Sequence, residues 1–186
     1  MKKILWRGIL YKSWEHCTLQ QEKDGMAVRS IITGNYQNQL FSVNNTLKLD
    51  EKWRIQEFEI RSDIDGKTNY TVGRRIGKDW WINDSVIPEL TGLLYIDISL
   101  TPFTNTLPVN HLLLEIGKSS DIDVLYIDLL ENEIKPVRQR YTRKAKYQYL
   151  YESLDYPFEA VITVDPKGIV TSYPGLFEEV VEGRMK

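Results

Sequence analysis

The segment Leu40–Asp50 reads Leu-Phe-Ser-Val-Asn-Asn-Thr-Leu-Lys-Leu-Asp, and apolar and polar residues alternate along most of it. One set of alternate positions carries Phe41, Val43, Leu47 and Leu49, whereas the other set is polar from position 42 onward. Successive side chains of a β-strand point to opposite faces of the sheet. The segment is therefore predicted to be a strand with one packed face and one polar face.

Two other segments repeat this period of two. Between positions 93 and 100, one face carries Leu94, Ile96, Ile98 and Leu100, and Tyr95 and Asp97 fall on the other. Between positions 158 and 165, the apolar face carries Phe158, Ala160, Ile162 and Val164. Turn signals recur along the chain at the spacing of a barrel or sandwich, which predicts about ten to twelve strands.

Two turns support antiparallel pairing of these strands. Asp65-Gly66 separates the strand-like segments 53–64 and 68–76, and Asp-Gly is a strong signal for a two-residue hairpin turn. The sequence Asp-Pro-Lys-Gly at 165–168 places Pro second and Gly fourth, as a type I turn prefers. It is predicted to join the segment 158–164 to the segment 169–173.

Helical patterns are short and few. The segment Leu107–Glu115 follows Thr-Asn-Thr, which offers capping side chains, and has Pro108 near its first turn. The tail Leu176–Val181 could also form a helical turn. No repeat, low-complexity tract or linker divides the chain, so we expect one mainly β domain over residues 1–186 with one or two short helices.

Composition narrows the possible partners. The 186 residues have a net charge of −2, which argues against a nucleic acid or an anionic membrane bound by bulk charge. Cys17 is the only cysteine, which excludes an internal disulfide and fits a reducing compartment. The apolar run at the N-terminus is interrupted by Arg7, too early for a signal sequence, and no apolar run is long enough to span a membrane. We expect a cytoplasmic protein without integral membrane association.

The sequence contains no recognisable catalytic or metal-binding motif. It has no dinucleotide or P-loop glycine pattern and no nucleophile elbow. His16 and His111 are far apart, and neither has metal-ligand spacing around it. We therefore predict no cofactor, no metal and no identifiable catalytic residue.

The segment Arg138–Lys146 combines basic and aromatic residues. On an extended chain Arg138 and Arg140 point one way, and Tyr141, Tyr149 and Tyr151 point the other. Such a pattern can bind single-stranded nucleic acid, but the slightly acidic chain favours a solvated cationic face. Tyrosine walls with a nearby arginine fork also suit a sugar, an acyl chain or a phosphate.

The C-terminal half resembles the glycolipid-binding family of small bacterial proteins, once known only as a domain of unknown function. The string Asp-Ile-Ser-Leu-Thr-Pro-Phe-Thr-Asn-Thr-Leu-Pro at 97–108 carries most of the resemblance. Gln-Arg-Tyr-Thr at 139–142, Val-Asp-Pro-Lys-Gly-Ile-Val at 164–170 and Tyr173-Pro174 add to it, and Trp6, Trp14 and Trp53-Arg54 are weaker matches.

This resemblance implies a strongly curved, half-open antiparallel sheet around a hydrophobic cavity, similar to the periplasmic lipoprotein carriers. It supplies no catalytic residues. The chain differs from those carriers because no signal sequence or small-residue lipobox precedes Cys17. Within the string, the hydroxyl and amide side chains of Thr104, Asn105 and Thr106 are expected to bond nearby backbone and fix a tight loop.

Together these observations predict a non-catalytic module that binds an amphipathic ligand, a lipid or glycolipid, on the concave face of the sheet. The expected ligand-binding residues are Arg74 and Arg140 for the head group, Trp53, Tyr95, Tyr141 and Tyr149 for the walls, and Asp97 and Asn105 for polar anchoring. One alternative is a cofactor-free enzyme that orients a reactive substrate in the same cavity, with Asp97, His111 or Arg140 converging there. A second alternative is a protein-interaction scaffold that uses an exposed sheet edge.

Overall fold

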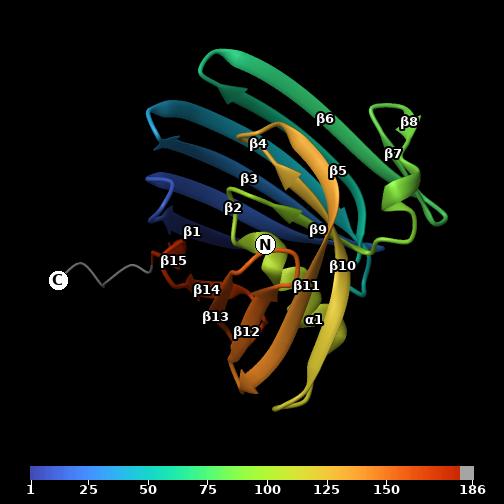
Figure 1. Cartoon of the computed structure of the whole chain (residues 1–186), viewed down its shortest axis with the longest axis vertical. Helices are drawn as coiled ribbons and strands as arrows, with labels where there is room; N and C mark the ends of the chain where they lie inside the picture. The colour runs from blue at the N-terminus through green and yellow to red at the C-terminus, as the bar shows by residue number, and fades with distance from the viewer. Residues whose placement is uncertain (181–186) are drawn as a thin grey trace.

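In the computed structural model, which describes residues 1–180, the chain forms one sheet of 15 strands with one short α-helix (Figure 1). The N-terminal strands are β1 Lys2–Gly8, β2 Ser13–Glu22, β3 Gly25–Tyr36, β4 Gln39–Leu49, β5 Ile55–Ile64, β6 Lys67–Ile76, β7 Asp79–Ile82 and β8 Ser85–Val86. The C-terminal strands are β9 Tyr95–Ile98, β10 Ser119–Asp128, β11 Glu133–Ala145, β12 Gln148–Ser153, β13 Glu159–Val164, β14 Val170–Tyr173 and β15 Phe177–Glu179. The helical elements are the 3₁₀ turns η1 Pro88–Leu90 and η2 Phe103–Asn105 and the helix α1 Thr106–Leu112.

The sheet is open, with β8 at one edge and β9 at the other. From the middle strand β1 the chain runs outward to β8, crosses to β9, and returns strand by strand to β15, which pairs with β1. All neighbours are antiparallel except β9 and β10, so the sheet is mixed rather than purely antiparallel. It has more strands than the ten to twelve expected, because strands as short as β8 and β15 contain too few residues to show a period.

The sheet curls so strongly that its C-terminal edge packs against its N-terminal half. Figure 1 shows β9–β11 lying across β1–β6, and one core cluster joins Phe58 and Trp80 to Ile96 and Val124. The indole N–H of Trp80 donates to the carbonyl oxygen of Leu93 (3.1 Å). The chain's own side chains therefore fill most of the concave surface of the N-terminal half.

The predicted strands and turns are confirmed. Along β4, Phe41, Val43, Leu47 and Leu49 are buried as expected. Asp65 and Gly66 both have positive φ, as a type I′ hairpin requires, and join β5 to β6. In the turn between β13 and β14, the Asp165 carbonyl accepts the N–H of Gly168 (2.9 Å).

Strand β9 departs from the expected pattern of one packed and one polar face. Tyr95 and Ile96 point to opposite faces of the strand, yet both are buried. The curl of the sheet encloses β9 on both sides, because Tyr95 contacts His111 of α1, and both Tyr95 and Ile96 belong to the main core cluster.

Two helical predictions have different outcomes. The predicted helix at 107–115 exists as α1, but it ends at Leu112 and Leu113 takes a left-handed φ of 47°. The tail prediction is wrong for the described residues, because Phe177–Glu179 form strand β15 between β1 and β14. Phe177 is buried there, and the backbone of both neighbouring strands gains a partner. Val181 lies outside the described residues.

The segment from Thr101 to Val109, which contains η2 and most of α1, is buried at every residue. Phe103 and Leu107 join the main core, and Val109 joins a second cluster with Tyr149 and Ile162. The segment therefore occupies the inside of the curve and connects the two core clusters.

Of the three side chains expected to bond nearby backbone, Thr104 does so, because its hydroxyl accepts the backbone N–H of Ile98 (3.3 Å). Other polar side chains of the segment bond to distant partners instead. Thr101 donates its hydroxyl to Glu15 Oε1 (2.9 Å), and Asn105 donates its amide to the Tyr141 hydroxyl (2.8 Å). The Thr106 hydroxyl accepts the backbone N–H of Val170 (3.3 Å). These bonds tie the buried segment to β2, β11 and β14.

Glu15 makes the stability of this arrangement dependent on pH. Burial raises the pKa of Glu15 to about 7, although hydrogen bonding from Thr101 favours ionisation. Because the pKa is higher in the folded state, the contribution of Glu15 is complete below pH 4.5 and is lost as the pH rises through 7. In the unmodified chain, the free energy of unfolding should fall by roughly 3 kcal/mol between those pH values. We expect this fall to be absent in Glu15→Gln, which lacks the titrating carboxyl group.

Urea unfolding at pH 4.5 and pH 8 tests this expectation, with the exposed Glu22 on the same strand providing the control Glu22→Gln. The difference in stability between Glu15→Gln and the unmodified chain should grow with pH, whereas the difference for Glu22→Gln should not. A constant difference for both variants contradicts the assignment.

Candidate functional site

Two adjoining hollows open on the inner side of the C-terminal strands. They have volumes of about 220 Å³ and about 530 Å³, and Tyr126, Tyr151 and Tyr156 line both. We call the two hollows together the tyrosine cleft. The smaller hollow is further lined by Leu10, Tyr11, Asp97, Ile98, Ser99, Thr101, Asn105, Phe158, Tyr173, Leu176 and Phe177, and the larger by Asp128, Lys135, Pro136, Val137, Gln139, Ser153 and Asp155.

Aromatic rings in contact with one another form the wall of the smaller hollow. The ring centroid of Tyr151 lies 5.9 Å from that of Phe158 and 6.0 Å from that of Tyr173, and Tyr173 lies 6.3 Å from Phe177. These are ordinary edge-on and tilted aromatic contacts, which hold each ring in place. The wall is therefore built before any ligand arrives.

The hydroxyl groups of this wall are available for a ligand. Four tyrosines that line the cleft, Tyr11, Tyr151, Tyr156 and Tyr173, make no side-chain hydrogen bond to another described residue. The hydroxyl oxygens of the buried Tyr151 and Tyr173 remain accessible. Burial raises the pKa of Tyr11 to about 12 and the pKa of Tyr151 and Tyr173 well above the usual range. The phenols therefore stay protonated at neutral pH and can donate hydrogen bonds.

Asp97 lies at the floor of the cleft. Its Oδ1 accepts the hydroxyl of Thr104 (2.9 Å), and its Oδ2 accepts the side-chain amide of Gln139 (2.7 Å). Burial raises the pKa of Asp97, and these two hydrogen bonds oppose the shift. The parallel pairing of β9 with β10 sets Asp97 directly beside Tyr126, which brings the carboxylate to the junction of the two hollows.

Asn105 is a second polar residue of the cleft floor, and a hydrogen bond to Tyr141 holds its side chain in place. Asn105 lines the smaller hollow and donates its amide to the hydroxyl of Tyr141, which is 1% exposed. Burial raises the pKa of Tyr141 well above its usual value. Tyr141 therefore supports the floor and does not line the cleft itself.

The structure brings together three of the residues predicted to bind a ligand, Asp97, Asn105 and Tyr141, and places the other five elsewhere. Tyr95 is buried against α1, where its hydroxyl lies 2.7 Å from His111 Nδ1, and burial raises its pKa to about 12. Tyr149 is buried beneath Arg143, whose guanidinium carbon lies 5.6 Å from the ring centroid. The ligand roles of these residues remain predictions.

The remaining predicted residues lie away from the tyrosine cleft. Trp53 lines a separate hollow of about 370 Å³ near the start of the chain. Arg74 pairs with Glu57 (3.3 Å) and Arg140 pairs with Asp121 (2.6 Å), on the opposite face from the buried side chains of their strands. Arg140 and Tyr141 do point to opposite sides of β11, as the alternation predicted.

The residues suggested for the enzyme alternative do not meet. Asp97 faces the cleft, His111 is bonded to Tyr95, and Arg140 is paired on the outside of the sheet. Among residues 1–180 no group of three or more His, Cys, Asp or Glu side chains is placed to hold a metal ion. In the same range, no helix has the length and apolar character needed to cross a membrane.

Sequence reasoning missed most of the aromatic wall. Tyr11 comes from the β1–β2 turn, Tyr126 from β10, Tyr156 and Phe158 from the β12–β13 loop, and Tyr173 from β14. Only two signals pointed to it, namely the alternation that put Tyr151 on the face of Tyr141 and the Tyr173-Pro174 pair within the family resemblance. Turn residues such as Tyr11 and Tyr156 carry no period and gave no signal.

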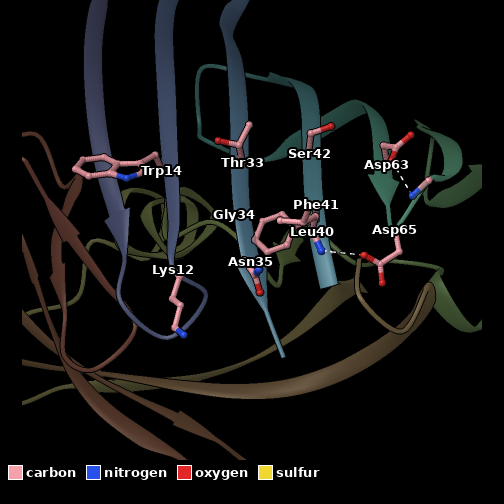
Figure 2. Close-up of a pocket in the computed structure, with 11 residues that line it drawn as sticks. Lys12, Trp14, Thr33, Gly34, Asn35, Leu40, Phe41, Ser42, Asp63 and Asp65 are labelled. Atoms are coloured by element: carbon pink, nitrogen blue, oxygen red, sulfur yellow. Dashed lines mark hydrogen bonds between the residues drawn. The ribbon is translucent and has the colours of Figure 1, made fainter. Parts of the chain in front are cut away.

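A further hollow, about 700 Å³, is a shallow groove on the outside of β2–β5. Figure 2 shows Trp14, Thr33, Ser42 and Asp63 on successive strands, with Lys12 and Asn35 nearer the strand ends. Trp14 is 49% exposed and Leu40 is 65% exposed. The hydrogen bonds drawn there serve the hairpin turns, such as Leu40 N–H to Asp65 Oδ1 (2.9 Å). The groove is open to solvent along the outer face of the sheet, so we favour the tyrosine cleft as the candidate site.

The comparison with known families identifies the chain. The model of the family described as "Putative glycolipid-binding" matches residues 3–179. The chain belongs to this family. No curated protein matches the chain.

Solved structures agree with the family assignment. A DUF1089 family protein from Pseudomonas aeruginosa superposes with a TM-score of 0.81 at 32% identity, over 90% of this chain and 92% of that one. A β-barrel-like protein with the domain DUF1849 from Brucella abortus superposes with a TM-score of 0.53 at 9% identity, over 96% and 94% of the two chains. The second likeness shows the fold alone.

The floor of the cleft offers a direct stability test. Tyr141→Phe removes the hydroxyl that accepts from Asn105, which leaves a buried amide without its partner. We expect the free energy of unfolding to fall by about 1–3 kcal/mol. The exposed Tyr70 provides the control Tyr70→Phe, which should change stability by less than about 0.5 kcal/mol. Equal effects in urea unfolding are inconsistent with a floor held by Tyr141.

Proposed function

We propose that this protein binds an amphipathic small molecule, a lipid or glycolipid, in the tyrosine cleft without transforming it. The observation that carries the proposal is the joining of an aromatic wall, a polar floor and an apolar mouth in one enclosed place. Asp97 and Asn105 supply the floor, and Leu10 and Leu176 supply the mouth. A ligand with a polar head and an apolar tail fits this order of surfaces.

The tyrosines suit a head group that carries hydroxyl groups. A ring face packs against the apolar side of a sugar, and the free phenol groups of Tyr151 and Tyr173 can donate to its oxygens. The amide of Gln139, bonded to Asp97, lines the adjoining hollow and extends the polar floor. Family membership supports this ligand class, since the family is described as glycolipid-binding.

The size of the cleft limits how much ligand it encloses. The larger hollow, about 530 Å³, falls in the range of small-molecule sites, which span about 300–1,000 Å³, and the smaller one, about 220 Å³, adjoins it. The chain's own core fills the rest of the concave surface, so the cleft holds a head group and only a short part of a tail. Burying six methylenes would contribute about 5 kcal/mol before ordering costs.

Tyr156 offers a test at the mouth of the cleft. It is 53% exposed, lines both hollows, and comes from a loop, so its removal should not unfold the sheet. With octyl β-glucoside as the probe, below its micellar concentration, we expect Tyr156→Ala to weaken binding about 5- to 10-fold in calorimetric titration. The matched control is Tyr70→Ala, because Tyr70 is 57% exposed on β6 and lies outside the cleft. Identical affinities for both variants and the unmodified chain place the site elsewhere.

Native mass spectrometry of the protein purified from its own cells tests the ligand class directly. We expect a bound mass of a lipid or glycolipid that is lost or reduced in Tyr156→Ala, because that variant removes one wall of the cleft. Protein that carries no such mass and binds no added glycoside or lipid rejects the proposed function.

A further inference from the structure

The charges around the cleft suggest which head group it selects. Three carboxylates, Asp97, Asp128 and Asp155, line the two hollows, whereas Lys135 is the single cationic side chain among the described lining residues. We propose that the bound head group carries an ammonium group rather than a phosphate. This inference rests on the proposed function, because it concerns the ligand of the same cleft.

The basic residues near the cleft are already engaged. Lys135 pairs with Glu133, which lies on the same strand. Arg138 pairs with Asp155 through its guanidinium (2.9 Å), and its backbone N–H also donates to that carboxylate (2.7 Å). Arg138 itself is 63% exposed and points to the outside. No arginine is among the described lining residues, so the cleft offers no planar fork for a phosphate.

Two of the carboxylates lack a cationic partner among residues 1–180. Asp97 accepts neutral donors only, from Thr104 and Gln139. Asp128 accepts the backbone N–H groups of Leu130 and Glu131 (3.1 Å each) and, on its other oxygen, the hydroxyl of Tyr126 (3.3 Å). Hydrogen bonds therefore hold the carboxylates of Asp97 and Asp128 in place, and no ion pair with a described residue neutralises them.

Aromatic rings lie between these two carboxylates. Tyr126, Tyr151 and Tyr156 line both hollows, and the face of an aromatic ring attracts a cation through its quadrupole. The Tyr126 hydroxyl donates to Asp128, and the pairing of β9 with β10 sets Asp97 beside Tyr126, so both carboxylates lie next to this ring. Rings and carboxylates thus favour the same sign of ligand charge, and they disfavour an anion.

A pair of probes that differ in one group tests the inference. Octyl β-glucoside and octyl 2-amino-2-deoxy-β-glucoside share the tail and the ring, and they differ only in a hydroxyl replaced by an ammonium at a pH that keeps the amine protonated. We expect the amino glycoside to bind about fivefold tighter or more, with the gain reduced by added salt. Octyl phosphate should bind weakest, because it meets unpaired carboxylates.

Variants of the cleft locate the preference. Asp97→Asn keeps the shape of the side chain and should reduce the preference for the amine to about twofold or less. Lys135→Gln removes the cationic residue found among the described lining residues. Because Lys135 is exposed, the chain should fold normally while the preference for the amine rises. Asp121→Asn, on the outer face beside Arg140, is the matched control and should leave the preference unchanged.

Octyltrimethylammonium separates the two sources of an ammonium group. Binding as tight as that of the amino glycoside indicates an alkylammonium head, and weaker binding indicates an amino sugar. Preference for the plain glucoside or for octyl phosphate overturns the inference and leaves the proposed function standing. An unchanged preference in Asp97→Asn and Lys135→Gln also overturns it. Failure of all four probes to bind rejects the proposed function together with the inference.

Discussion

The fold depends on the burial of a short segment, rich in hydroxyl and amide side chains, inside the curve of the sheet. Every residue from Thr101 to Val109 is buried, so each polar side chain there needs a partner. Thr101 donates a hydrogen bond to Glu15 on β2, and Asn105 donates one to Tyr141 on β11. An unpaired buried polar group costs about 1–3 kcal/mol. These bonds therefore favour the observed position of the segment over shifted positions in which the same groups would lack partners. The segment thereby sets how β2, β9 and β11 approach one another.

The tyrosine cleft is what remains after this packing. The edge strand β9 and its neighbour β10 fill the N-terminal half of the concave face, and α1 covers part of the C-terminal half through Val109. The space that stays open lies between β9–β10 and β12–β14, where tyrosines from five segments meet around Asp97. A site built from so many elements is held rigidly by the sheet, and among its tyrosines only the loop residue Tyr156 projects into solvent.

The relatives show how far the fold extends beyond this chain. The protein from Pseudomonas aeruginosa shares the curved sheet at 32% identity, and the protein from Brucella abortus shares it at 9%. A fold that survives at such low identity does not specify a ligand, because function resides in the residues of the site. The nature of the ligand therefore has to be inferred from the charges and rings of the cleft.

The sequence by itself determined the local features of this protein. Period-two alternation located β4 and β13, and Asp65-Gly66 specified the hairpin between β5 and β6. Because successive side chains of a strand alternate, Arg140 and Tyr141 were expected on opposite sides of β11. Only the tertiary structure decided which faces would enclose a ligand. Arg74 and Arg140 pair with acidic residues on neighbouring strands. Tyr11 and Tyr173 both pack against Phe177 of the last strand, which pairs with the first strand. Alternation fixes the direction of a side chain relative to its own strand, but what that side chain faces depends on curvature and on long-range strand order, which no local pattern encodes.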